Sequence, residues 1–262
     1  MRVEIQDDFN LRKIVESGQC FRASLIDDDI YRFVTGNNVV YMKETEKGIF
    51  SVSCGFNEWQ NTWVKYFDLN RNYRNIFEKE YGKHPFVDKA MNAGRGLRIL
   101  WQDPWEILVS TIISQRKSIP AIQKAVDLIA EKYGTVQKTE YEKLNLFPSA
   151  TDLINVSEDD MRSCGVGYRA AYILDAISKV SSGEVDLNMI SQLPDTELIQ
   201  YLKCIRGVGE KVANCVALFS YGRSACVPVD VWISRAINDD CNGKDPFDLY
   251  GNHAGIIQQY IF

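Results

Sequence analysis

The hydrophobic period of the chain changes near Asn57, and this change constrains the fold more than any other feature of the sequence. Before Asn57, apolar runs bounded by turn residues are typical of an antiparallel meander, with strands expected at 31–35, 39–45 and 49–53. After Asn57, apolar residues recur at helical spacing, beginning with Trp59, Trp63, Tyr66 and Phe67. The sequence therefore predicts an α+β protein, with a sheet-bearing N-terminal domain over residues 1–100 and a mainly helical region over 101–262.

The composition and the cysteine pattern indicate a globular protein from a reducing compartment. Hydrophobic residues make up 45% of the 262 residues and charged residues 25%, and no apolar run approaches the ~18 to 20 residues that span a bilayer. The acidic N-terminus lacks the pattern of a secretory signal. Seven cysteines are scattered without a CxxC pair, which fits free thiols. We therefore expect a cytoplasmic protein with no membrane partner.

The net charge of −5 by itself argues against a nucleic-acid partner, because phosphate neutralisation usually leaves a basic excess. One small positive face, or the amide groups at the start of a helix, can nevertheless bind phosphate without changing the net charge. The charge lowers the expectation of DNA binding without deciding it.

The most informative segment is a glycine turn between two helical runs, Gly207-Val208-Gly209. Such a turn exposes backbone amides, and together with the dipole of the following helix these amides suit a DNA phosphate. The alternative is a turn that joins two helices and binds nothing. We expect this helix-hairpin-helix unit near residues 198–220.

A lysine and an aspartate lie close to this turn in the sequence. Lys211 follows the turn directly, and Asp230 comes nineteen residues later in the apolar, proline-fixed run Val227-Pro228-Val229-Asp230-Val231. Burial of a carboxylate costs free energy unless the group is paired or hydrogen-bonded, so an acid at this position should have a structural or a catalytic role. One alternative for Asp230 is a helix N-cap, and one for Lys211 is an ordinary surface lysine.

The turn, the lysine and the aspartate at this spacing resemble the helix-hairpin-helix DNA glycosylase superfamily, in the branch that carries both Lys and Asp. In this chemistry a neutral lysine amine attacks C1′ of the sugar, displaces the base and leaves an imine that drives strand cleavage. The resemblance implies that Lys211 is the nucleophile. It also implies that Asp230 stabilises the positive charge that develops on the sugar.

Four further segments resemble 8-oxoguanine DNA glycosylase of a non-eukaryotic, prokaryotic type: 17–22, 96–106, 165–170 and 254–262. The resemblance implies an N-terminal domain similar to half of a TATA-binding protein, two helical domains and a cleft between them. It implies base-excision repair, in which a monomer excises an oxidised purine from double-stranded DNA and nicks the strand. Only Cys241 lies beyond Asp230, so we expect no iron-sulfur cluster and no other cofactor.

The family pattern also implies a set of residues that bind the extruded base. A backbone carbonyl at Gly18 would accept a hydrogen bond from the N7 proton, which 8-oxoguanine has and guanine lacks. Cys215, one turn after Lys211, would contact one face of the base and Phe262 the other, while Gln258 would read its Watson–Crick edge. Phe21 belongs to the same set. The alternatives are a turn for Gly18, core positions for Cys215 and Phe262, and a solvated helix position for Gln258.

The chain departs from the eukaryotic pattern at several DNA-contacting positions. Arg116 stands where an asparagine fills the gap left by the flipped base, and Ala121 stands where an arginine reads the orphaned cytosine. Tyr168 and Arg169 remain available for the opposite strand, and Trp232 replaces a histidine that contacts phosphate. We therefore expect Arg116, Tyr168, Arg169, Gly207, Gly209 and Trp232 to contact DNA, with a relaxed preference for the opposite base.

The resemblance further implies a cation held by the backbone carbonyls of Lys203, Ile205 and Val208, whereas no side-chain metal site is visible in the sequence. Two rival functions remain at this stage. One is another helix-hairpin-helix glycosylase for mismatched or alkylated bases, although the alkylation type generally lacks the lysine. The other is a non-catalytic helix-hairpin-helix DNA-binding protein, which would need neither Lys211 nor Asp230. The last residues keep a helical pattern without a stop signal, which leaves open whether the natural chain continues past Phe262.

Overall fold

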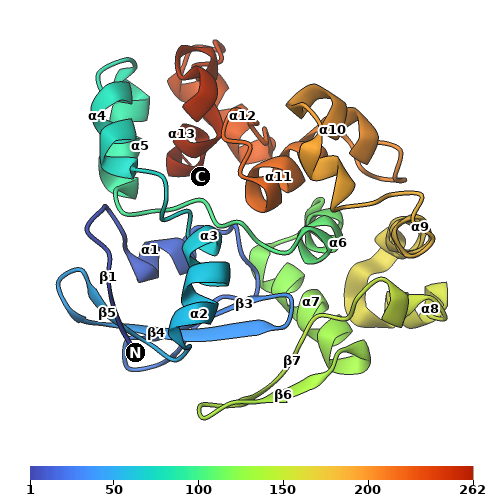
Figure 1. Cartoon of the computed structure of the whole chain (residues 1–262). Helices are drawn as coiled ribbons and strands as arrows, with labels where there is room; N and C mark the ends of the chain where they lie inside the picture. Colours follow the sequence, from blue (N-terminus) through green and yellow to red (C-terminus); the bar gives the residue numbers. More distant parts are fainter. Residues whose placement is uncertain (262) are drawn as a thin grey trace.

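The structure, a computed structural model, describes residues 1–261. Its N-terminal part is a five-stranded antiparallel sheet with the strand order β1-β5-β4-β3-β2, seen at the lower left of Figure 1. The strands are β1 Arg2–Glu4, β2 Ser24–Asp27, β3 Ile30–Thr35, β4 Asn38–Glu46 and β5 Ile49–Val52. The three predicted strands are thus confirmed as β3, β4 and β5, whereas β1 and β2 were not expected.

The turns and the buried face of this sheet follow from the sequence pattern. In the β3–β4 hairpin Thr35 pairs with Asn38, and Gly36 in the turn has a φ of +52°, a conformation that favours glycine. The buried side chains Phe33, Val40, Met42 and Phe50 form a core with aromatic residues of the segment 59–67. Phe33 and Phe67 meet edge to face with ring centroids 4.9 Å apart. The aromatic stripe predicted after Asn57 therefore covers one face of the sheet.

The rest of the chain is mainly helical and surrounds a second, larger core. The helices that surround or approach it are α4 Tyr73–Glu80, α5 Pro85–Gly94, α6 Pro104–Ser114, α7 Ile119–Tyr133, α8 Glu158–Met161, α9 Ala170–Ser181, α10 Asp195–Leu202, α11 Glu210–Tyr221, α12 Val231–Asp240 and α13 Ala254–Ile261. Shorter elements are α1 Leu11–Glu16, α2 Phe56–Glu58, α3 Val64–Tyr66 and the hairpin of β6 Val136–Lys138 with β7 Lys143–Asn145. Helices α6 and α11 pack together at the centre of this core (Figure 1).

Two central helices begin at residues that are typical of helix starts. Asp103 caps α6 by accepting a hydrogen bond from the Glu106 amide at 2.9 Å, and Pro104 is the first helical residue. Helix α7 begins at Ile119, although Ser118 makes no side-chain cap. Among residues 1–261, no helix has the length and apolar character needed to cross a bilayer.

Helices α4 and α5 lie in the stretch predicted as the N-terminal domain, yet their apolar side chains join the larger core. Helix α5 packs on α13, at the opposite end of the chain, and the two run side by side in Figure 1. The contact is close, because a Cβ atom placed on Gly94 would lie 2.4 Å from the Tyr260 ring. Helix α13 therefore rests on an element from the first hundred residues.

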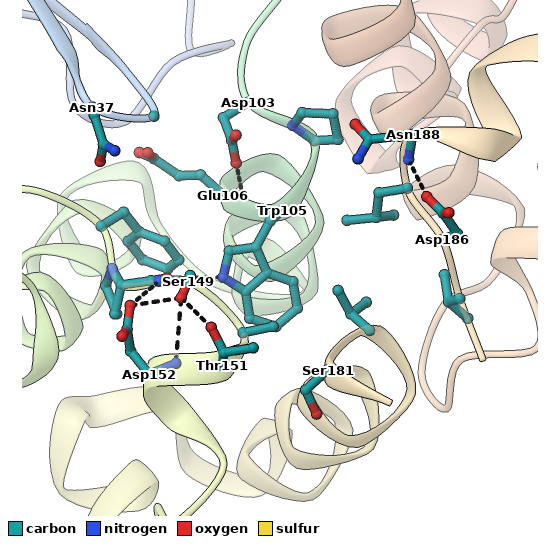
Figure 2. Close-up of a pocket in the computed structure, with 18 of the residues that line it drawn as sticks. Asn37, Asp103, Trp105, Glu106, Ser149, Thr151, Asp152, Ser181, Asp186 and Asn188 are labelled. Carbon is teal, nitrogen blue, oxygen red and sulfur yellow. Dashed lines mark hydrogen bonds between the residues drawn. The ribbon is translucent and has the colours of Figure 1, made fainter. Parts of the chain in front are cut away.

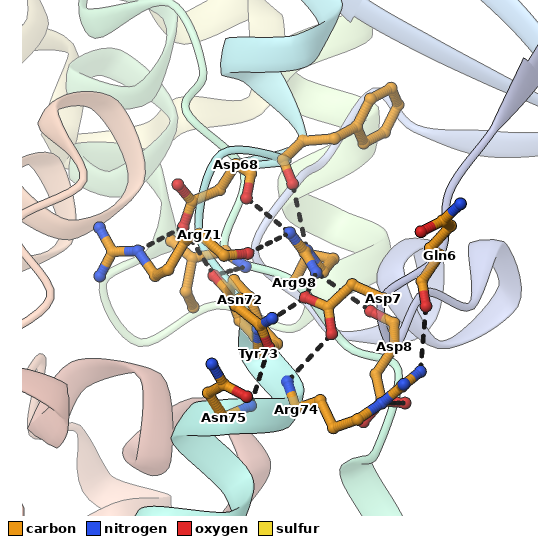
Figure 3. Close-up of polar contacts among 12 residues, drawn as sticks. Gln6, Asp7, Asp8, Asp68, Arg71, Asn72, Tyr73, Arg74, Asn75 and Arg98 are labelled. Carbon is orange, nitrogen blue, oxygen red and sulfur yellow. Dashed lines mark hydrogen bonds and ion pairs between the residues drawn. The ribbon is translucent and has the colours of Figure 1, made fainter.

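A buried arginine joins the N-terminal segment to the two cores (Figure 3). Arg98 is fully buried and donates to the Asp7 carboxylate at 2.7 Å and to the carbonyl oxygens of Asp68 and Arg71 at 2.5 and 3.0 Å. Its guanidinium group also lies 4.0 Å from the ring centroid of Tyr73. A buried charge is tolerated when its hydrogen bonds are satisfied, and these bonds fix the segment that leads into α6.

Candidate active site

A cavity of about 630 Å³ brings together residues that are far apart in the sequence. Its walls come from the loop after α1, the α6–α7 connection, α11, the start of α12 and α13. Seven of the predicted site residues line it: Gly18, Phe21, Lys211, Cys215, Asp230, Trp232 and Gln258. The predicted nucleophile, its acidic partner and the base-binding residues thus share one cavity.

Lys211 lies in the first turn of α11, and its side chain is half-buried. Its Nζ atom donates to the Ser114 hydroxyl at 3.3 Å. Ser114 gives its own proton to the Thr111 carbonyl at 2.7 Å. Because that proton is already used, the Ser114 oxygen can only accept from Lys211. The lone pair of a neutral Lys211 amine therefore stays available to a substrate.

Asp230 serves as the N-cap of α12. Its Oδ1 atom accepts hydrogen bonds from the amides of Trp232 and Ile233, both at 2.9 Å. The helix-cap alternative considered for this residue is therefore present in the structure. The same side chain lines the cavity with Lys211, and no donor within residues 1–261 reaches Oδ2. One oxygen of the carboxylate is structural and the other is free to face a positive charge.

Cys215 lies one turn after Lys211 on α11 and is buried. Burial is the main cause that raises the pKa of its thiol, and the nearby Asp230 raises it further. The thiol is therefore neutral at pH 7 and does not compete with the amine as a nucleophile. Phe262, predicted to lie across the base from Cys215, is outside the described residues.

The two groups predicted to read the base are polar and unpaired. Gly18 has a φ of +71°, and within the described part of the chain no group donates to its carbonyl oxygen. The Oε1 atom of Gln258 is buried without a hydrogen-bond partner. An unpaired buried side-chain atom such as the Oε1 atom of Gln258 is rare in folded proteins, and both residues line the cavity. This arrangement suits a ligand that supplies the missing hydrogen bonds.

The predicted helix-hairpin-helix unit is formed by α10 and α11. Gly207 in its turn has a φ of +81°, and a Cβ atom there would lie 2.3 Å from the Tyr172 ring. Gly209 occupies the N-cap position of α11 with no side chain above the helix start. Only glycine fits the first position, and the second leaves the amides at the start of α11 open to an anion.

The loop between α6 and α7 carries Arg116, whose side chain is exposed and whose φ is +52°. This left-handed conformation is strained for a residue with a side chain. Neighbouring bonds hold it: Gln115 donates to the Gly207 carbonyl at 3.1 Å, and Lys117 donates to the Gly165 carbonyl at 2.5 Å. Arg116 is therefore presented on a loop that is tied to the hairpin.

Arg169 is placed differently from the sequence prediction. It is only 6% exposed, and its guanidinium group donates to the carbonyl oxygens of Gln115 and Val166. Tyr168, whose ring lies 4.5 Å from that guanidinium group, is 50% exposed. In this structure Arg169 supports the Arg116 loop from inside, and Tyr168 alone of the pair faces solvent.

Sequence reasoning missed several polar residues that line the cavity, among them Ser114, Lys117 and Gln259. Burial, followed by the charge of Arg169, lowers the pKa of the Lys117 amine. Lys117 is therefore a second candidate nucleophile in the same cavity. No sequence signal marks Ser114 or Gln259, since their roles arise from packing between helices. Trp232, by contrast, was predicted, and it is 67% exposed with Arg235 5.2 Å from its ring centroid.

A larger cavity of about 830 Å³ lies between the β3–β4 turn, the start of α6, the loop 146–152 and the segment after α9 (Figure 2). Four carboxylates line it, from Asp103, Glu106, Asp152 and Asp186, and no lysine or arginine does. Burial raises the pKa of Glu106 to about 7. A negative lining repels phosphate, so this cavity is not the DNA site. In the described part of the chain no group of three His, Cys, Asp or Glu side chains could hold a metal.

Comparisons with known proteins agree with this geometry. Residues 2–108 match the 8-oxoguanine DNA glycosylase N-terminal domain, and residues 109–246 match the HhH-GPD superfamily of base excision DNA repair proteins. A probable N-glycosylase/DNA lyase from Methanothermobacter thermautotrophicus is 31% identical over 225 residues, which cover 75% of this chain and 70% of the relative.

Two solved structures superpose closely on the chain. The structure of MBOgg1 in complex with a low affinity DNA ligand has a TM-score of 0.94 and 36% identity, and covers 99% of this chain and 93% of that one. The Clostridium acetobutylicum 8-oxoguanine glycosylase/lyase, in complex with dsDNA containing cytosine opposite to 8-oxoG, has a TM-score of 0.90 and 32% identity, and covers 100% of this chain and 96% of that one. The chain belongs to the 8-oxoguanine DNA glycosylase family of the HhH-GPD superfamily.

Proposed function

We propose that this enzyme excises 8-oxoguanine from duplex DNA and then nicks the strand, with Lys211 as the nucleophile. It is an N-glycosylase/DNA lyase of base excision repair. The observation that carries the assignment of residues is the cavity in which Lys211 and Asp230 meet the unpaired groups of Gly18 and Gln258. A non-catalytic DNA-binding protein would need only the hairpin of α10 and α11. It would not need a cavity that brings a lysine and an aspartate together with unpaired polar groups.

The proposed reaction begins with the neutral amine of Lys211, which forms a bond to C1′ while the bond from C1′ to the base breaks. The electrons of that bond leave with the base, which takes up a proton. Opening of the sugar ring then yields an imine between C1′ and Nζ. Loss of a C2′ proton and departure of the 3′ phosphate complete the β-elimination, and water hydrolyses the imine to release Lys211.

Asp230 would act on the charge that this reaction creates. The sugar becomes positively charged as the base departs, and a fixed carboxylate stabilises that charge without reorganising. The cap bonds of Oδ1 hold the carboxylate in place, so its free oxygen is preorganised. Asp230 thus combines a structural role with a catalytic one.

Discrimination of the lesion would depend on the hydrogen bonds that the cavity lacks. The Gly18 carbonyl would accept from N7–H of 8-oxoguanine, whereas in guanine it would face a lone pair. Gln258 would read the Watson–Crick edge, and the face of Cys215 together with Phe21 would contact the base. Phe262 remains a proposed contact on the other face.

The duplex would be held by the hairpin and by side chains around the cavity mouth. Amides at Gly207 and Gly209 would bind phosphate, and exposed Trp232 would pack against the backbone beside the lesion. Arg116 would fill the gap left by the flipped base, and Tyr168 would contact the opposite strand. All these groups belong to one chain, which supports a monomer as the acting unit.

We propose no resident redox cofactor. A hairpin cation held by the carbonyls of Lys203, Ile205 and Val208 would link the turn to a DNA phosphate by its positive charge. Within residues 1–261 no amide donates to the carbonyls of Lys203 and Val208, while that of Ile205 accepts from the Val208 amide at 3.1 Å. Two free carbonyls at one turn support this role.

The test is borohydride trapping on duplex DNA that contains 8-oxoguanine. Reduction of the imine links the protein covalently to the DNA, so the wild-type enzyme should give a trapped complex. Lys211→Gln should bind the duplex yet give none, since an amide cannot attack C1′. Lys117→Gln is the matched variant, because it removes the other amine of the same cavity, and it should still be trapped.

The trapping results of the two variants decide which of the two lysines is the nucleophile. Trapping that survives in Lys211→Gln and disappears in Lys117→Gln would move the nucleophile to Lys117. No trapping by the wild-type enzyme on any lesion would favour a DNA-binding module. Duplex affinity, measured at one fixed salt concentration for every variant, separates lost chemistry from lost binding.

A further inference from the structure

We propose that Gln259 is a specificity-determining positioning residue, which holds the Gly18 carbonyl at a fixed place relative to Gln258. The inference rests on the function proposed above, in which Gly18 and Gln258 read opposite parts of the base. It concerns a residue next to Gln258 that makes a different contact, to the loop that carries Gly18.

Gln258 and Gln259 are consecutive buried residues of α13, with 3% and 4% exposure. Burial of two adjacent glutamines on a helix is unusual, because each carries polar atoms that must be paired. Gln258 leaves its Oε1 atom without a partner. Gln259 donates from Nε2 to the carbonyl oxygen of Ser17 at 2.8 Å. One glutamine is thus open to a ligand, and the other is bonded to the residue before Gly18.

The loop is held from its other side by the N-terminal part of the fold. Gln19 donates to the Ser17 hydroxyl and to the Arg98 carbonyl, both at 2.8 Å. It accepts from the Leu100 amide at 2.8 Å. The carbonyl oxygen of Gln19 itself accepts from Gln102 at 2.9 Å. These bonds fix the loop to the segment that runs through Arg98 toward α6.

The carbonyls on both sides of Gly18 are therefore engaged, while its own carbonyl is free within the described residues. The bonds to Ser17 and Gln19 hold the peptide units before and after the Gly18–Gln19 unit and so restrict its rotation, and the φ of +71° at Gly18 is one that favours glycine. The free carbonyl is consequently the one that the loop can offer to the cavity.

Among these restraints, the bond from Gln259 is the one that comes from α13. Gln19 and Gln102 fix the loop to the N-terminal part, but they do not fix its distance from Gln258. Removal of the Gln259 donor would leave both reading groups in place and loosen their spacing. Displacement of the groups that position a substrate by about 1 Å can slow the reaction substantially.

The consequence is specific to the base. Attack on C1′ and elimination depend on Lys211 and Asp230, which lie on other elements, α11 and the start of α12. A preformed abasic site has no base to read, so its cleavage does not use Gly18 or Gln258. Loss of the Gln259 bond should slow excision of 8-oxoguanine and spare nicking of an abasic site.

The experiment compares these two activities in one enzyme. Gln259→Met keeps the approximate size of the side chain and removes the donor. Gln259→Glu places a carboxylate oxygen against the Ser17 carbonyl and repels it. Single-turnover rates are measured with saturating enzyme on a duplex with 8-oxoguanine opposite cytosine and on the same duplex with an abasic site. Ile129→Val, in the buried part of α7 far along the chain from these loops, controls for a general loss of stability.

We expect the ratio of excision to abasic-site nicking to fall about tenfold in Gln259→Met, which corresponds to ~1.4 kcal/mol, and further in Gln259→Glu. The ratio should stay within about twofold of wild type in Ile129→Val. A ratio that stays within twofold in both Gln259 variants, or excision and nicking that fall in parallel, would make Gln259 an ordinary core residue. The wild-type enzyme is measured alongside, so failure of the proposed function appears there and failure of this inference only in the variants.

Discussion

The double role proposed for Asp230 can be tested with two substitutions that separate its charge from its helix cap. Asp230→Asn keeps an oxygen that can accept from the Trp232 and Ile233 amides, which lie 2.9 Å from Oδ1, and asparagine caps helices about as well as aspartate. Asp230→Ala removes both the cap and the charge. The two variants therefore share the loss of charge and differ in the cap.

The expected magnitudes follow from these contacts. Loss of the cap in Asp230→Ala should lower the free energy of unfolding by about 1 kcal/mol, which shifts Tm by roughly 2–4 °C in a chain of this size. In Asp230→Asn the helix loses only the attraction of a charge to its dipole, worth about 0.3–1 kcal/mol. Loss of transition-state stabilisation should slow excision by about 10²- to 10³-fold in both variants.

The assay pairs single-turnover excision of 8-oxoguanine with thermal unfolding of the same preparations. We expect nearly equal rates for the two variants and a lower Tm for Asp230→Ala than for Asp230→Asn. The reasoning would be refuted if Asp230→Asn excised within about threefold of the wild-type rate, because the cap alone would then account for the residue. Measurements well below both unfolding transitions keep stability out of the rates.

Three further predictions concern the hairpin, the opposite strand and pH. Gly207→Ala places a methyl group within 2.3 Å of the Tyr172 ring at a φ of +81°, so duplex affinity should fall at least tenfold at fixed salt; unchanged affinity would remove the hairpin from the DNA interface. Neither Ala121 nor buried Arg169 offers a guanidinium group to an orphaned cytosine, so the single-turnover preference for cytosine opposite the lesion should stay below roughly a hundredfold, or ~2.7 kcal/mol, and a larger preference over every other base would contradict this. Burial raises the pKa of Glu106 to about 7 from 4.5, so the native state binds this proton more tightly than the unfolded chain, and its contribution to stability declines as pH rises from about 4.5 to 7. Glu106→Gln should therefore raise Tm more at pH 8 than at pH 5, and an equal change at both pH values would show that the carboxyl titrates normally.

The sequence predicted most of the residues that meet in the cavity, because their residue types carry chemistry in a fixed chain order. Lys211 follows a glycine turn, and Asp230 sits in an apolar run before a helix, so both positions are visible without coordinates. The strands of the meander were equally clear, because their alternation and turn residues are local signals. Strand β1 was missed because its three residues become a strand only by pairing with β5.

The remaining parts of the site arise from contacts that no local pattern encodes. Ser114 orients Lys211 because α6 and α11 pack side by side. Gln259 reaches Ser17 because the two ends of the chain meet. Arg169 was expected to contact the opposite DNA strand with Tyr168, yet its guanidinium group is buried and donates to backbone carbonyls. Side-chain direction at such positions is decided by tertiary packing.

Because α5 packs on α13, we expect the site to fold together with elements from the first hundred residues. Tyr260 packs against Gly94. Helix α13, which bears Gln258, therefore rests on α5, a helix from the first hundred residues. A fragment that starts at the second family match, residue 109, would contain Lys211, Asp230 and the hairpin but would lack α5. The side of α13 that packs on α5 would then be exposed, and such a fragment should aggregate rather than fold. The boundary between the two matched regions is thus a boundary of sequence similarity, and we expect the unit that unfolds cooperatively to be larger than either region.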